Sequence, residues 1–272
     1  MTAGTHYDTE DYVRRITALL AQAESTNTPA EAEMYVSKAQ ELMLSHAISE
    51  ELIRAAQVKK GVAQEPEKII RQSVKLTGVY RKVESDIVVA VAFANDCRSV
   101  VHDQTWSTPH TYVITVVGHE SDVDNVLRLS ASLLIQHSTA KRTWERKGGV
   151  PTHVSSMEKF KIRRQFTISY AQGVGSRLQL ARREAKITVA EAQVEAQRVT
   201  IADAQQSVAL ALVDRKKRVD NWIDEKYGRS LRSVTHNYAG GGYSAAEAGY
   251  EAGSRADLGQ PRVGGTRPAL EG

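Results

Sequence analysis

The stretch Thr111-Tyr-Val-Ile-Thr-Val-Val-Gly118 decides the fold class of this 272-residue chain. It consists almost entirely of β-branched and aromatic residues, which favour a pleated, half-buried strand. A similar stretch, Cys97–Asp103, precedes it, and the intervening segment Gln104–His110 predicts a hairpin with an extended loop. Ile69–Leu76 alternates partly between apolar and polar residues and is a third candidate strand. The sequence therefore predicts a small sheet in this region.

Helical patterns flank these strands. Ile87–Ala94 is rich in β-branched residues, but its flanks extend a helical pattern, so we expect a helix from about Val83 to Asn95. After the hairpin, Ser121 is placed to cap a helix whose first turn carries Asp122 and Asp124, where the helix dipole favours acids. The face of this helix that we expect to be buried consists of Val123, Val126, Leu127, Leu129, Leu133 and Leu134.

Helix formers dominate the C-terminal half of the chain. Gly148–Pro151 interrupts the chain, and no proline follows from Ser156 to about Gly228. Ala181–Gln205 is rich in Ala, Glu, Gln and Arg and has little large apolar surface, so it is a long solvated helix, a coiled-coil arm or a flexible insert. An apolar stripe then returns at Val208, Leu210, Leu212, Val213, Trp222 and Ile223.

The first sixty residues read as three helices. An apolar stripe predicts the first, Thr28 and Pro29 mark the start of the second, and Ser49 caps a short third. The whole chain therefore predicts an α+β protein, predominantly α, with a small mixed sheet and helices. Its regions are a three-helix domain at 1–60, an α+β domain with a hairpin at 67–140, a long helical region at 156–258 and a disordered tail at 259–272.

Two parts of the chain resemble a known family. The first is Ala18-Leu-Leu-Ala-Gln-Ala-Glu-Ser-Thr-Asn-Thr-Pro-Ala-Glu-Ala-Glu33, followed by Lys38-Ala-Gln-Glu-Leu-Met43 and Ile48. Over roughly residues 11–55 this resembles the DUF2786 domain. Later motifs, such as Asn95-Asp-Cys-Arg-Ser-Val-Val101, resemble the region that follows this domain in bacterial and phage members. The resemblance implies an association with bacterial or phage genomes and supplies no catalytic residues.

Basic residues are unevenly placed, although the net charge is only +4. Residues 141–186 contain twelve Lys and Arg against three acids, and 215–218 is a second basic cluster. This asymmetry suits the phosphate backbone of DNA or RNA, and the interleaved Trp144, Phe160 and Phe166 are candidates for stacking on bases. The alternative is a solvated helix face that complements the acidic N-terminal region. The candidate nucleic-acid-binding residues are Lys161, Arg163, Arg164, Arg177, Arg182 and Arg183.

One motif occurs twice. Gly175-Ser-Arg-Leu-Gln-Leu180 and Gly253-Ser-Arg-Ala-Asp-Leu258 share Gly-Ser-Arg-x-x-Leu, and each follows another glycine and a tyrosine. Small residues on a helix allow a second backbone to approach closely, so the pattern predicts two helices that pack on each other or on the sheet. The alternative is a pair of sites in which Arg177 and Arg255 bind phosphate or carboxylate.

Recognisable catalytic motifs are absent from the sequence. It contains no metalloprotease His pair, nucleophile elbow, Walker loop or dinucleotide fingerprint. His102, His110 and His119 lie on or beside the hairpin, but their spacing does not define a metal site. Cys97 is the single cysteine, and we expect it to be a buried structural thiol. We therefore assign no catalytic residue, metal or cofactor. The sequence favours a non-enzyme and leaves enzyme activity open, because sites are often assembled from distant positions.

The N-terminus has neither a basic nor an apolar segment typical of a signal peptide. The longest apolar run, Ile87–Ala94, is shorter than the roughly 20 residues of a membrane span. We expect no membrane partner and a cytoplasmic location, or a virion-associated one if a phage encodes the protein.

The leading hypothesis is a non-catalytic accessory protein of a phage or bacterium that binds DNA or RNA through basic helical faces, without reading base sequence. One alternative is a structural or assembly protein that forms homo-oligomers through the long helices at 181–225. Another is an enzyme with an unrecognised site, metal-assisted or not.

Overall fold

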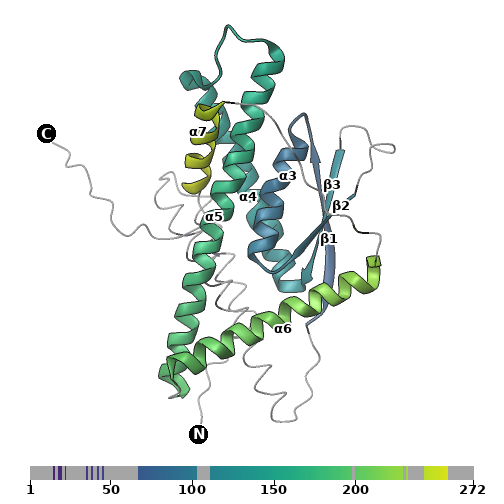
Figure 1. The fold of residues 1–272 in the computed structure, drawn as a ribbon, viewed down its shortest axis with the longest axis vertical. Helices are drawn as coiled ribbons and strands as arrows, with labels where there is room; N and C mark the ends of the chain where they lie inside the picture. Colours follow the sequence, from purple (N-terminus) through teal and green to yellow (C-terminus); the bar gives the residue numbers. More distant parts are fainter. Residues whose placement is uncertain are drawn as a thin grey trace, which may run out of the picture. The chain divides into compact units, whose positions relative to one another are not determined.

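The computed structural model describes residues 67–102, 111–197, 200–228, 231 and 242–256, together with isolated positions between 15 and 45 (Figure 1). The chain divides into two compact units, Met1–Met43 with Asp257–Gly272, and Leu44–Ala256. The second unit contains both the sheet region and the long helical region. Among the described helices, none combines the length and apolar character that crossing a membrane requires.

In the first unit, single positions are described, and all of them are helical. They are Arg15, Ala18, Leu19, Gln22, Tyr35, Lys38 and Leu42. These positions fall within the first two helices that the sequence predicts. The predicted third helix after Ser49, the hairpin loop at 104–110 and the tail at 259–272 lie outside the described residues.

Three strands form one sheet in the order β1-β3-β2. They are β1 (Ile69–Thr77), β2 (Arg98–His102) and β3 (Thr111–His119), and they confirm the three predicted strands. β3 lies in the centre and is buried along nearly its whole length, which explains its density of β-branched residues. Both pairings are antiparallel, so the described sheet is not mixed in strand direction. The sheet has one strand direction pattern because β3 lies between β1 and β2 and is antiparallel to both.

The helices α3 (Arg81–Ala94) and α4 (Glu120–Trp144) confirm the two predicted beside the strands, and Figure 1 shows both next to the sheet. The predicted cap of α4 is wrong, because the helix begins at Glu120 with His119 as its N-cap. Ser121 instead donates its backbone N–H and its hydroxyl to Glu67 Oε1, at 2.9 and 2.6 Å. A carboxylate from a distant part of the chain therefore satisfies the start of α4.

The buried face of α4 is close to the predicted one. Val123, Val126, Leu129 and Leu133 are buried, whereas Leu127 and Leu134 are half-buried. Buried polar residues, among them His137, also lie on this face. A short π-helical segment, η1 (Glu145–Gly149), ends the helical stretch at the predicted glycine break.

Two long helices follow, α5 (Ser156–Gln197) and α6 (Ile201–Tyr227), as the sequence predicts. The part of α5 after Ala181 is neither a solvated arm nor a flexible insert. Its small side chains pack against α6 in one cluster, made of Ala181, Ala185, Val189, Ala190, Ala204, Val208 and Leu212. Leu210 and Val213, predicted in the apolar stripe, are exposed instead. Alanine side chains are small and let two helices approach closely. The segment after Ala181 therefore buries its apolar side chains against α6, although their total apolar surface is small.

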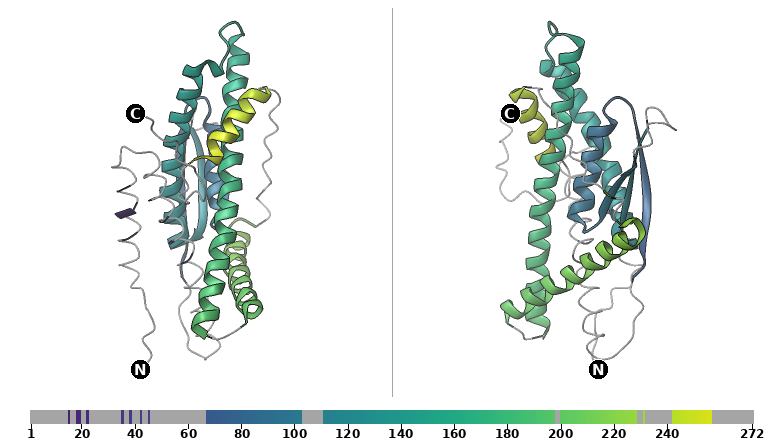
Figure 2. Two further views of the ribbon diagram at one scale, coloured as in Figure 1. Left: turned by 90° about the vertical axis from the view of Figure 1, so that its left-hand side faces the viewer. Right: turned by 45° about the vertical axis from the view of Figure 1, so that its right-hand side comes forward.

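The last described helix, α7 (Tyr243–Ser254), packs along α5 (Figures 1 and 2). A side chain at Gly249 or Gly253 would overlap the backbone carbonyl of Phe166 or Tyr170 on α5. The repeated motif therefore marks two helices that pack on each other, as predicted. Arg177 donates from Nη1 to the backbone carbonyls of Ser254 and Ala256 at the end of α7. Its guanidinium therefore connects α5 to the end of α7.

Candidate anion-binding site

The six basic residues that the sequence selects do not form one continuous site. Lys161 and Arg183 are both exposed on α5, but 22 residues separate them. At 1.5 Å per residue they lie roughly 30 Å apart along the helix axis. Arg164 lies beside Lys161, with its guanidinium 5.7 Å from the Phe160 ring centre.

Two further predicted residues are engaged within the chain, as Arg177 is. Arg163 pairs with Glu145, with 3.1 Å between Nε and Oε1. Arg182 donates to the Ala94 carbonyl at the end of α3, at 2.6 Å, and pairs with Asp96. These contacts partly neutralise the predicted basic face.

The aromatic residues proposed to stack on bases make internal contacts. Phe166 is buried and stacks on Trp144, with 4.6 Å between ring centres. Phe160 stacks on Tyr80 at 5.3 Å. The interpretation of Phe166 as a base-stacking residue is therefore wrong, because its apolar ring belongs to the core between α4 and α5.

The basic cluster at 215–218 contains both buried and exposed side chains. Arg215 is 2% exposed and pairs with Asp122 at 2.7 Å and with Glu67 at 2.9 Å. Burial alone would raise the pKa of Glu67, but Arg215 and the hydrogen bonds from Ser121 lower it to about 2. Arg215 therefore belongs to the interior and not to a surface face. Lys216, in contrast, is exposed.

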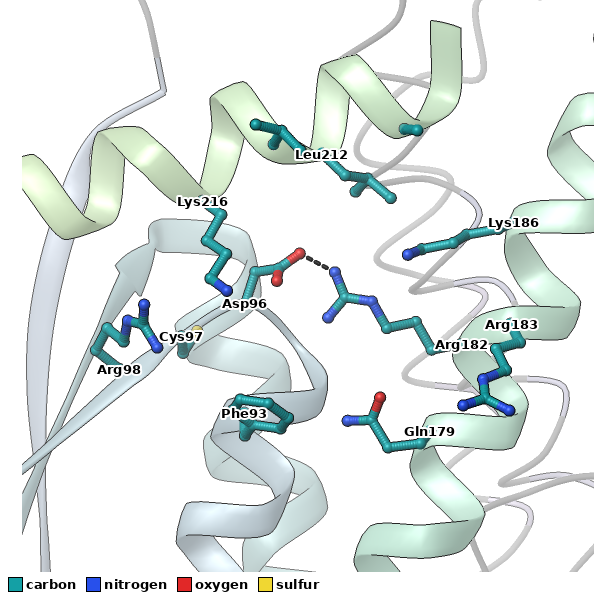
Figure 3. Close-up of a pocket in the computed structure, with 12 residues that line it drawn as sticks. Phe93, Asp96, Cys97, Arg98, Gln179, Arg182, Arg183, Lys186, Leu212 and Lys216 are labelled. Atoms are coloured by element: carbon teal, nitrogen blue, oxygen red, sulfur yellow. Dashed lines mark hydrogen bonds and ion pairs between the residues drawn. The ribbon is translucent and has the colours of Figure 1, made fainter. Parts of the chain in front are cut away.

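A pocket of about 370 Å³ lies where the end of α3 and the start of β2 meet α5 and α6 (Figure 3). Its lining contains a single carboxylate, Asp96. Asp96 makes the turn between α3 and β2 with a φ of +54°, a conformation that Asp tolerates better than most residues. The described residues of the same lining include five cationic side chains: Arg98, Arg182, Arg183, Lys186 and Lys216.

The spacing along both helices explains why they line the pocket. α5 contributes Gln179, Arg182, Arg183 and Lys186, and α6 contributes Ala209, Leu212, Val213 and Lys216. Each set follows the pattern i, i+3, i+4, i+7, which places all four residues on one face of a helix. The pocket is therefore the junction of one face of α5 with one face of α6.

The cations outnumber their partners. Arg98 pairs with Asp220 at 2.5 Å, and Arg182 pairs with Asp96. Among the described residues, none forms an ion pair with Arg183, Lys186 or Lys216.

The electrostatics of Lys186 follow from this surplus. Burial, together with the neighbouring Arg182 and Arg183, lowers the pKa of its ammonium group. An anion bound in the pocket would offset this repulsion, so the arrangement is suited to phosphate or carboxylate.

The pocket lining also contains apolar side chains. Phe93 on α3 is 58% exposed, and Val213, which follows Leu212 on α6, is 59% exposed. Figure 3 shows the Phe93 ring below Asp96 and across from Gln179. The pocket lining therefore contains both cationic and apolar groups, which suits an amphipathic anion.

Neither Cys97 nor His119 adds catalytic geometry at the pocket, and His110 lies outside the described residues. Cys97 is buried, as predicted, and burial raises the pKa of its thiol well above the ordinary value. A side chain at Gly118 would overlap its Sγ, so the thiol fills a tight space in the core. His119 is buried beside Arg215, and burial lowers its pKa to about 4. Within the described ranges, no group of three His, Cys, Asp or Glu side chains is arranged to hold a metal.

Sequence reasoning missed most of this pocket. Lys186 and Lys216 lie within the two basic clusters, but nothing in the sequence singles them out. Arg98 and Phe93 carry no local signal of a site, because one begins a strand and the other lies in a predicted helix. The i, i+3, i+4, i+7 spacing on α5 and α6 was the one local signal of the pocket. This spacing shows which residues share a face of one helix, but it does not show which faces of two helices contact each other.

The described part of the chain is thus an α+β protein, mostly helical, with a cationic pocket at the junction of its helices and sheet. Residues 11–50 match the family described as protein of unknown function (DUF2786), which confirms the resemblance for the N-terminal region. The match does not extend to the pocket. No curated protein and no solved structure matches the chain.

Proposed function

We propose that this protein binds nucleic acid without reading base sequence, and that the cationic pocket makes the principal backbone contact. The observation that supports this proposal is the convergence of Arg183, Lys186 and Lys216 from two helices, with no ion-pair partner among the described residues. Lys and Arg side chains that neutralise phosphates release counterions, which drives binding independently of sequence. Such binding suits a non-catalytic accessory role, and the resemblance of the N-terminal region to DUF2786 implies a bacterium or phage as the setting.

Fluorescence anisotropy with labelled DNA and RNA oligonucleotides over a salt series tests the proposal. In the pocket variant, Arg183, Lys186 and Lys216 are all replaced by Gln. In the control variant, the exposed Arg71, Lys75 and Lys226 are replaced by Gln, with the same loss of charge.

We expect the pocket variant to bind at least tenfold more weakly than the wild type, because two or three phosphate contacts are lost. The slope of log K against log salt should fall by about 2 in magnitude, while the control keeps nearly the wild-type slope. Equal affinities of the pocket variant and the wild type at low salt would reject the proposal.

Homo-oligomeric assembly is a second candidate function, and exposed apolar side chains on the long helices favour it. Leu180 and Ile187 on α5 and Leu210 on α6 are each about half exposed. Light scattering on the anisotropy samples gives the mass. A dimer that Leu210→Glu dissociates would support assembly through α6, and a monomer at high concentration would reject it.

A further inference from the structure

We infer that the pocket accepts one unpaired nucleotide, so that the bound nucleic acid is single-stranded. This inference rests on the proposed function and adds the class of strand that it binds. It starts from the presence of cationic and aromatic groups in one pocket lining. The cationic side chains would hold the phosphate, and Phe93 would cover the base.

Phe93 is the residue that we expect to distinguish single-stranded from double-stranded nucleic acid. Phe93 is 58% exposed and lines the same pocket as the unpaired cations, although phenylalanine is usually buried. The ring lies in the last turn of α3, and Arg182 holds the end of that turn through its bond to the Ala94 carbonyl. An exposed ring that shares a pocket with such cations offers a stacking surface, and stacking on aromatic rings tolerates every base.

A base within a duplex cannot stack on Phe93 in the same way. In a duplex, both faces of each base are covered by its neighbours, so Phe93 reaches a base only after that base leaves the stack. A single strand presents its base faces without this cost. The volume of about 370 Å³ also lies at the lower end of the range for small-ligand pockets, which suits one nucleotide and not a base-paired helix.

The test compares the full-length wild type with Phe93→Leu, which keeps an apolar side chain and removes the ring. The probes are a single-stranded oligonucleotide, its duplex, and a single strand with 2-aminopurine, whose fluorescence falls on stacking. Ile135→Leu, at an exposed position on α4, is the matched control. A nucleoside monophosphate is added as a competitor.

We expect the wild type to bind the single strand more tightly than the duplex. Phe93→Leu should weaken single-strand binding about tenfold, leave duplex binding and the salt slope unchanged, and abolish the fluorescence change. The control should match the wild type. The monophosphate should compete only weakly, because it lacks the neighbouring phosphates.

Two results would overturn the inference while leaving the proposed function intact. One is unchanged single-strand affinity in Phe93→Leu together with weak binding by the Gln variant of the cationic residues. The other is equal affinity of the wild type for single strand and duplex. If the monophosphate binds as tightly as the strand, the pocket is a free-nucleotide site and the inference is wrong. If the Gln variant binds normally, the proposed function fails and the inference fails with it.

Discussion

Arg215 shows how a basic residue can belong to the interior of this protein. Its guanidinium donates to Asp122 through Nε and Nη2, at 3.1 and 2.7 Å, and to Glu67 through Nη1. Glu67 in turn accepts both hydrogen bonds from Ser121 at the start of α4. One side chain on α6 therefore joins the segment before β1 to α4.

We expect Arg215→Met to lower the free energy of unfolding by about 3–5 kcal/mol, because it leaves the buried carboxylate of Asp122 and the half-buried carboxylate of Glu67 without their cation. Urea denaturation followed by circular dichroism measures the change. Lys217→Met, at an exposed position on the same helix, should change stability by less than about 0.5 kcal/mol. A loss below 1 kcal/mol in the Arg215 variant would contradict the prediction.

His137 predicts a pH dependence of stability. It is buried on α4 with Nε2 3.0 Å from Thr167 Oγ1, and Glu84 lies 4.0 Å from Nδ1. Burial and Lys141 lower its pKa from 6.5 to about 3, so the folded protein holds it neutral where the unfolded chain protonates it. Stability is therefore lost as the pH falls below 6.5, by up to about 1.4 kcal/mol per pH unit for this one group.

His137→Gln removes this linkage. We therefore expect the slope of the free energy of unfolding against pH, between pH 6 and 4, to decrease by the contribution of nearly one proton. Urea denaturation at intervals of half a pH unit measures the slope. His153→Gln, at an exposed position, controls for the loss of a histidine as such. An unchanged slope in the His137 variant would show that this histidine does not remain neutral in the folded protein.

At the scale of elements, the interface between α5 and α7 depends on the absence of side chains. Gly249 and Gly253 lie against the backbone of α5, and Gly173 lies against the backbone of α7. Gly175, two residues nearer the pocket on α5, has only Ala90 Cβ at 3.5 Å from the position of an added Cβ. The two motifs thus contain glycines with different roles.

Gly253→Ala should destabilise the protein by about 1–3 kcal/mol, because the new methyl group overlaps the Tyr170 carbonyl and forces α7 away. Gly175→Ala has ordinary contact distances and should be neutral or stabilise the protein by up to about 1 kcal/mol through helix propensity. Thermal unfolding compares the two variants. Hydrogen exchange of α7 should accelerate only in Gly253→Ala; equal protection in both variants would reject the proposed packing role.

At the scale of the whole molecule, the described core lies within Leu44–Ala256. It includes the sheet, α3 to α7 and the pocket. Because these elements bury their apolar faces on one another, we expect the fragment Leu44–Ala256 to fold cooperatively without the rest of the chain. Calorimetry should give one two-state transition, and the fragment should bind oligonucleotides as the full chain does. A fragment without a cooperative transition would contradict this expectation.

Much of the secondary structure was predictable because its signals are local. β3 concentrates β-branched residues on a central strand, and the spacing of apolar residues marks α3 and α4. The cap of α4 was not predictable, because its acceptor, Glu67, lies 54 residues away in the sequence. The exposure of Leu210 and Val213 was missed for the same reason, since the position of α6 decides which of its apolar residues are covered.

The sequence alone determined the three strands, the long helices, the glycine-lined helix pair and the uneven placement of basic residues. Each of these depends on backbone propensity or side-chain spacing within one segment. Only the tertiary structure decided that Arg215 is buried, that Arg182 closes the end of α3, and that Phe93 and Lys186 line the same pocket. The physical reason is that a charge or a ring acquires its role from the groups opposite it, and these come from elements far apart in the chain.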